Sequence, residues 1–101
     1  YIDDVVDAIE KIIFYKNKKK IPFNIFNIGS DNPKSLKLFL SKIKKNLNKK
    51  IKINNMKFQL GDIKKTHASI TKISKAVNYR PKTNIKEGIK KFIDWYKDYY
   101  K

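Results

Sequence analysis

The sequence lacks several residue types on which small functional sites are commonly built. It contains no cysteine, which excludes disulfide bonds and thiolate metal sites and permits a reducing compartment. Its only glycines are Gly29, Gly61 and Gly88, which lie too far apart to form a glycine-rich dinucleotide-binding turn. No apolar run is long enough to cross a bilayer, and no apolar leader follows Tyr1. We therefore expect a cytoplasmic protein with no membrane partner and no metal site.

Arginine is also nearly absent, although the chain is strongly basic. The net charge is +16, and Arg80 is the single arginine beside 24 lysines. Lysine, isoleucine and asparagine, which all have A/T-rich codons, make up half of the chain, so nucleotide composition explains the charge. Proteins that read nucleic acids usually use arginine for bidentate contacts with phosphate and guanine. We expect no nucleic-acid partner, and a basic nucleic-acid-binding module is kept as an alternative.

The hydrophobic content of 41% favours a folded chain, and its first half predicts a helix, a strand and a second helix. Residues 3–15 have helical periodicity, and we expect Asp3 and Asp4 to cap the free N–H groups of that helix. Residues 22–30 predict a short strand, and Ser35 is the expected cap of the next helix. The apolar faces of the two helices are Val5, Val6, Ile9, Ile12 and Ile13, and Leu36, Phe39, Leu40, Ile43 and Leu47.

The second half predicts a weaker strand, a short helix and a long helix. Residues 51–58 form the strand candidate. The short helix is expected within residues 68–79, with Ser69 as its N-cap and Asn78 in the left-handed conformation at its end. Residues 84–100 give the last helix, and Trp95, Tyr96, Tyr99 and Tyr100 are expected to serve core and rim packing. Two short strands cannot build a sizeable sheet, so the α/β chain is predicted to be incomplete on its own.

Five motifs in this order resemble one family. They are "YIDDVVDAI", "FNIGS", "QLGD", "THASITKISKAVNYRPKT" and "IKEGIKKFIDWYKDYY". Together they are similar to the C-terminal part of nucleotide-sugar epimerases and dehydratases of the extended short-chain dehydrogenase/reductase family, closest to the UDP-glucuronate 4-epimerase type. The resemblance implies that residues 1–101 are the substrate-binding portion of an extended Rossmann-type enzyme. It also implies that NAD is bound by an N-terminal domain outside this chain, and that the full-length enzyme is a homodimer.

The resemblance assigns substrate contact to the "QLGD" turn. Asp62 matches the carboxylate that accepts hydrogen bonds from the nucleoside sugar, and Gln59 matches a position where the galactose 4-epimerase branch has arginine. An ordinary Gly-Asp turn is the alternative. His67 has only Asp62 as a carboxylate near it in sequence, and we assign it no chemistry. Only Tyr15 has a lysine four residues on, Lys19, which we interpret as a chance match to the family's catalytic Tyr-x-x-x-Lys pair.

We therefore expect a fragment of an NAD-dependent epimerase that contributes UDP-sugar binding and is inactive alone, without catalytic or cofactor-binding residues of its own. Asp3 and Asp4 have a second interpretation in this family, as residues that orient groups beside the substrate. A related nucleotide-sugar dehydratase or decarboxylase is the alternative within the family. Outside it, a nucleic-acid-binding module and a non-catalytic interaction protein are the alternatives.

Overall fold

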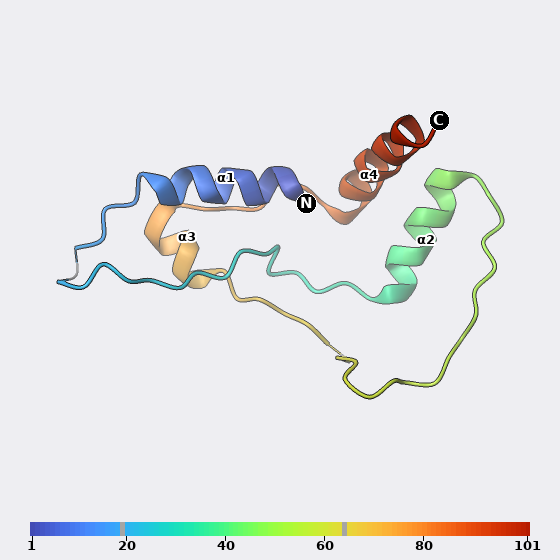
Figure 1. Cartoon of the computed structure of the whole chain (residues 1–101), viewed down its shortest axis with the longest axis horizontal. Coiled ribbons are helices and arrows are strands. Elements are labelled where there is room, and N and C mark those ends of the chain that lie inside the picture. The colour runs from blue at the N-terminus through green and yellow to red at the C-terminus, as the bar shows by residue number, and fades with distance from the viewer. Residues whose placement is uncertain (19, 64) are drawn as a thin grey trace. The chain divides into compact units, whose positions relative to one another are not determined.

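Four helices are the regular elements of the computed structural model, which describes residues 1–18, 20–63 and 65–101 (Figure 1). They match the four expected helices in number and order. The chain divides into two compact units: unit 1 is Tyr1–Pro33 with His67–Thr83, and unit 2 is Lys34–Thr66 with Asn84–Lys101. None of the helices in the described ranges is long and apolar enough to cross a bilayer. The helices are α1 (Ile2–Ile13), α2 (Leu36–Leu47), α3 (Thr71–Val77) and α4 (Ile85–Tyr99).

The two predicted strands are wrong, and with them the α/β class. Residues 22–30 and 51–58 contain no strand, and the part of the chain that the structure describes has no sheet. A run of β-branched and aromatic residues favours an extended backbone, but a strand also needs a neighbouring backbone with which to pair. In the first segment, two carbonyls accept hydrogen bonds from side chains: Ile25 O from Lys72 Nζ at 2.7 Å, and Gly29 O from the Tyr79 hydroxyl at 3.2 Å.

The core of unit 1 is small and joins three parts of the chain. Ala8 and Ile73 are fully buried, and Tyr79 is 1% exposed. α1 contributes the small residue, α3 the branched residue and the segment after α3 the aromatic ring. Close packing of this kind explains why two short helices and a loop hold together. Ile12, Phe26, Ile28, Ile70 and Val77 pack around these three residues and are half-buried.

The predicted apolar face of α1 is only partly used. The helix buries Asp4 and Ala8, which lie one turn apart. Val6 and Ile9 remain 47% and 49% exposed, and Ile13 is 70% exposed. The helix is apolar over a wide arc, so hydrophobic periodicity alone could not show which part of the arc meets α3.

Unit 2 contains the α2–α4 helix pair. Ile89 and Ile93, one turn apart on α4, are buried, and on α2 Leu40, Ile43 and Leu47 are half-buried. Lys97 Nζ also donates to Asn46 O at 3.3 Å, which joins the C-terminal parts of the two helices. The pair is therefore stabilised along a narrow stripe rather than a broad face.

The aromatic residues at the end of α4 take no part in the core, so the core part of the predicted core and rim packing is wrong. Trp95 is 52% exposed and Tyr99 is 68% exposed, so these rings lie outside the core. They contact one another instead, as in the stacked pair Trp95–Tyr99, whose ring centroids are 5.4 Å apart. The rings of Tyr96 and Tyr100 also contact each other, with centroids 4.7 Å apart, but they are tilted by 43° rather than stacked.

Most helix ends follow the local sequence rules. Ser35 Oγ accepts a hydrogen bond from Leu38 N at 3.2 Å, as expected for a cap. Asn78 has φ 51° and ψ 37°, so the predicted left-handed C-terminus of α3 is confirmed. The predicted N-cap position is wrong by one residue, because Ile70 and not Ser69 is the N-cap residue of α3. Ser69 Oγ still accepts a long hydrogen bond from Thr71 N, at 3.4 Å, at the start of the helix. Ser69 Oγ shares a hydrogen bond with Thr71 Oγ1 at 3.1 Å, which engages the hydroxyl beside the helix.

Candidate functional site

The predicted contact residues lie in one turn that is closed by two reciprocal hydrogen bonds. Asp62 N donates to Gln59 O at 3.2 Å, and Gln59 N donates to Asp62 Oδ2 at 3.1 Å. Gly61 has φ +95°, a backbone angle that residues with a side chain rarely adopt. This conformation gives the turn its curvature. The structure thus brings Gln59 and Asp62 together, through a backbone shape that only a glycine supports readily.

The turn is open to solvent and keeps acceptor capacity. Gln59 and Asp62 are exposed, and a β-carbon at Gly61 would meet no atom within 4 Å. An ionised carboxylate has about four acceptor positions on two oxygens, and the turn itself uses Oδ2. Asp62 can therefore hold its own turn and accept hydrogen bonds from a diol at the same time.

A cavity of about 250 Å³ in unit 2 lies elsewhere. It lies between α2 and the extended residues that follow it. Neither Gln59 nor Asp62 lines this cavity, and both residues are exposed. The lining residues are Lys37, Leu40, Ser41, Lys44, Ile51 and Ile53.

His67 has a carboxylate partner that sequence proximity did not reveal. Its Nε2 lies 2.6 Å from Asp31 Oδ1, and the two residues are 36 positions apart in the chain. The His67 and Asp31 side chains are 47% and 39% exposed. No group of three or more metal-binding side chains occurs among the described residues. The pair thus joins two backbone segments of unit 1.

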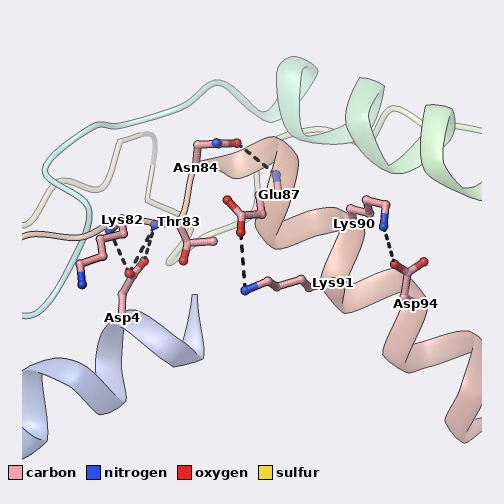
Figure 2. A network of polar contacts seen from close by, with 8 residues as sticks. All are labelled: Asp4, Lys82, Thr83, Asn84, Glu87, Lys90, Lys91 and Asp94. Carbon is pink, nitrogen blue, oxygen red and sulfur yellow. Dashed lines mark hydrogen bonds and ion pairs between the residues drawn. The ribbon is translucent and has the colours of Figure 1, made fainter.

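Asp4 does not cap its helix, so the favoured interpretation from the sequence is wrong. Its carboxylate is buried and accepts hydrogen bonds from Lys82 N at 2.9 Å and Thr83 N at 3.1 Å (Figure 2). Burial alone would raise the pKa of Asp4, but the backbone hydrogen bonds from Lys82 and Thr83 outweigh it and lower the pKa. The residue is ionised at neutral pH and fastens the segment after α3 to α1. It was missed because its partners lie 78 and 79 residues away.

Tyr79 is a second buried polar residue that joins distant segments. Its hydroxyl donates to Gly29 O at 3.2 Å, and Ser74 Oγ donates to Tyr79 O at 2.9 Å. Burial raises the pKa of Tyr79, and the charges of Asp4 and Asp7 raise it further. The sequence placed Tyr79 in a helix-ending motif but gave no sign that its ring fills the core of unit 1.

The described residues do not fit a dinucleotide cofactor. The three glycines of the chain are isolated, and Gly61 lies in the exposed turn rather than between a strand and a helix. Lys19, the predicted chance partner of Tyr15, lies outside the described residues. Tyr15 itself contacts Phe26 edge to face, with ring centroids 5.8 Å apart. No NAD-binding function is therefore derived for these residues.

The chain is similar over nearly its whole length to several known proteins. It is 42% identical over 96 residues to an uncharacterized protein of Methanocaldococcus jannaschii, a match that covers 95% of this chain and 28% of that protein. It is 32% identical to Protein CapI of Staphylococcus aureus, a match that covers 100% of this chain and 34% of CapI. It is 35% identical to UDP-glucuronate 4-epimerase 2 of Arabidopsis thaliana, a match that covers 100% of this chain and 26% of that protein. No family model matches the chain.

These similarities confirm the resemblance drawn from the five motifs. The chain belongs to the family of nucleotide-sugar epimerases. Its homologues over the whole chain include UDP-glucuronate 4-epimerases, at 34% to 35% identity. It spans about a quarter to a third of the length of the relatives described above.

Proposed function

We propose that this chain is the C-terminal, UDP-sugar-binding portion of an NAD-dependent epimerase that acts on UDP-glucuronate or a closely related nucleotide sugar. The observation that carries the proposal is the similarity of the entire chain to UDP-glucuronate 4-epimerases. The relatives are about three to four times as long, so the residues that bind NAD and perform the chemistry belong to the remainder of the protein. The whole protein reverses the configuration of one sugar carbon, and this chain holds the nucleotide.

The turn Gln59–Asp62 supports the binding role. The hydroxyl groups of a ribose diol are two neighbouring donors, and a carboxylate is a strong acceptor for both. The left-handed Gly61 brings backbone to the surface with no side chain over it. Gln59 lies at the other end of the same turn and has an uncharged side chain, which offers a nucleotide hydrogen bonds without a cationic pair.

Titration calorimetry of the native gene product with UDP and with UDP-glucuronate tests the proposal. Asp62→Asn retains one acceptor oxygen for Gln59 N but loses the charge and the second oxygen. Hydrogen bonds to charged groups contribute about 1.5 to 3 kcal/mol, so the affinity for UDP is expected to fall about ten-fold or more. Gln59→Ala is expected to have a smaller effect.

Asp98→Asn is the matched control, because it removes one exposed carboxylate of the same unit and changes the net charge equally. It is expected to leave UDP affinity unchanged. Equal affinities of the Asp62 and Asp98 variants would contradict the assignment of the turn. Absence of any UDP binding by the native gene product would contradict the proposed function itself.

A further inference from the structure

Two backbone segments of unit 1 meet where the chain leaves this unit and where it returns. A β-carbon built on Gly29 would lie 3.2 Å from the β-carbon of Ala68, so no larger residue fits there without a shift. Nearby, Asp31 Oδ1 lies 2.6 Å from His67 Nε2. Asp31 precedes the segment Lys34–Thr66 and His67 follows it. The two contacts therefore close this segment at its base.

The closed segment contains the turn Gln59–Asp62. Fixing both ends of a long segment removes many of the conformations that it could otherwise adopt. We propose that Asp31 and His67 are positioning residues, which restrict the segment between them and so improve nucleotide binding by the turn. This inference rests on the proposed function, because it assigns the pair a role in the same binding event.

The local geometry suits both residues to this role. Asp31 has φ 51°, a left-handed conformation that aspartate tolerates better than most side chains. The Nε2 atom of an imidazole can donate in the protonated ring and in one neutral tautomer, so the contact does not require a charged histidine. The hydrogen bond from Tyr79 to Gly29 O ties the Asp31 segment to the buried core. We call the contact between Asp31 and His67 the joint. Its Asp31 side is thus anchored to the core, and His67 attaches the chain segment on the other side.

A double-mutant cycle on the native gene product tests the pair. Asp31→Gly removes the carboxylate and still permits the left-handed backbone, while His67→Ala removes the donor. Because exposed pairs of this kind contribute little, we expect each variant to raise the UDP dissociation constant only about three-fold. The double variant should be no weaker than either single variant. In the activity assay, KM for UDP-glucuronate should rise by the same factor while kcat stays constant.

Two further measurements separate positioning from simple loss of stability. His67→Gln keeps an N–H donor and is expected to recover most of the lost affinity. Backbone amide relaxation should show larger motion at Gln59, Gly61 and Asp62 in Asp31→Gly, with amide protection in α1 and α3 unchanged. Strictly additive effects of the two single variants, or no effect of either, would overturn the inference that Asp31 and His67 act together as positioning residues.

Failure of the joint can be distinguished from failure of the proposed function. If Asp62→Asn leaves UDP binding unchanged, the turn has no nucleotide role and the proposed function loses its site. Amide relaxation at Gln59–Asp62 then tests only whether the joint restricts the motion of the segment, because this measurement needs no ligand. If Asp62→Asn weakens binding and the Asp31 and His67 variants do not, only the positioning inference is wrong.

Discussion

The two units of this chain are stabilised by different kinds of contact. In unit 1, partners far apart in sequence meet through buried or half-buried polar atoms, such as Asp4 with Thr83 and Tyr79 with Gly29. In unit 2, the main tertiary contact is between two amphipathic helices, and the α4 aromatic rings remain exposed. Directional hydrogen bonds specify one arrangement, whereas a narrow apolar stripe specifies less. The comparison teaches that a unit with few buried side chains can still be specified by polar contacts between distant residues.

The largest effect is expected from removing one core side chain in each unit. Ile73→Ala leaves a cavity beside Ala8 and Tyr79 and should cost about 3 kcal/mol of unfolding free energy. Ile93→Ala is the counterpart in unit 2. Native-state hydrogen exchange should show lost protection mainly in α3 for the first variant and mainly in α4 for the second. Equal loss in both units for either variant would show that they unfold as one.

Asp4→Ala comes next and tests the polar contacts of unit 1. It leaves the N–H groups of Lys82 and Thr83 without their acceptor, which should cost about 2 kcal/mol. Because the folded-state pKa of Asp4 is lowered, its contribution is present above the ordinary carboxyl pKa of about 4 and is lost as the pH falls through the folded value. Chemical denaturation from pH 7 to pH 2 measures this. The acid-dependent loss should shrink in Asp4→Asn, and an unchanged slope would contradict the assignment.

Tyr79→Phe should cost about 1 kcal/mol, because Gly29 O loses its donor while the ring still fills the core. The pKa of Tyr79 is raised, so its contribution to stability changes with pH in the opposite direction to that of Asp4. The stability from the protonated hydroxyl is full below the ordinary tyrosine pKa of about 10 and declines as the pH rises through the folded value. Denaturation between pH 8 and pH 11 should show this decline in the native sequence and a weaker one in Tyr79→Phe.

Effects as small as that of Tyr79→Phe are expected at two asparagines with the same left-handed geometry in different units. Asn78 and Asn48 have φ 51° at the ends of α3 and α2. Replacement by alanine should cost about 1 kcal/mol at each site, and replacement by glycine should be close to neutral. Thermal unfolding of the four variants checks this. A larger loss at Asn78 than at Asn48 would mean that backbone geometry in unit 1 is coupled to its core.

The sequence was sufficient for features that depend on neighbouring residues. Helix positions followed from periodicity, and Ser35 and Asn78 followed from the local rules for helix ends. The turn at Gln59–Asp62 also followed from its own residues, since Gly61 and Asp62 build it with local hydrogen bonds. Membership of the epimerase family was likewise visible in five short motifs, because each of them is local.

Features that depend on distant partners were not predictable. The segments 22–30 and 51–58 have strand-like composition, but pairing requires a second backbone that the pattern does not contain. Asp4 reads as a capping residue until Lys82 and Thr83 are placed beside it. His67 likewise has its carboxylate at Asp31, 36 residues away, rather than at Asp62.

The sequence by itself determined where the helices lie, how α2 begins and α3 ends, that residues Gln59–Asp62 form a turn, and which family the chain joins. Only the tertiary structure decided that Ala8 rather than Ile9 faces the core, and that the aromatic residues of α4 stay outside it. It also decided that buried carboxylate and hydroxyl groups fasten unit 1. The physical reason is range: helix propensity and turn chemistry act over a few residues, whereas burial and long-range hydrogen bonds exist only after distant segments have met.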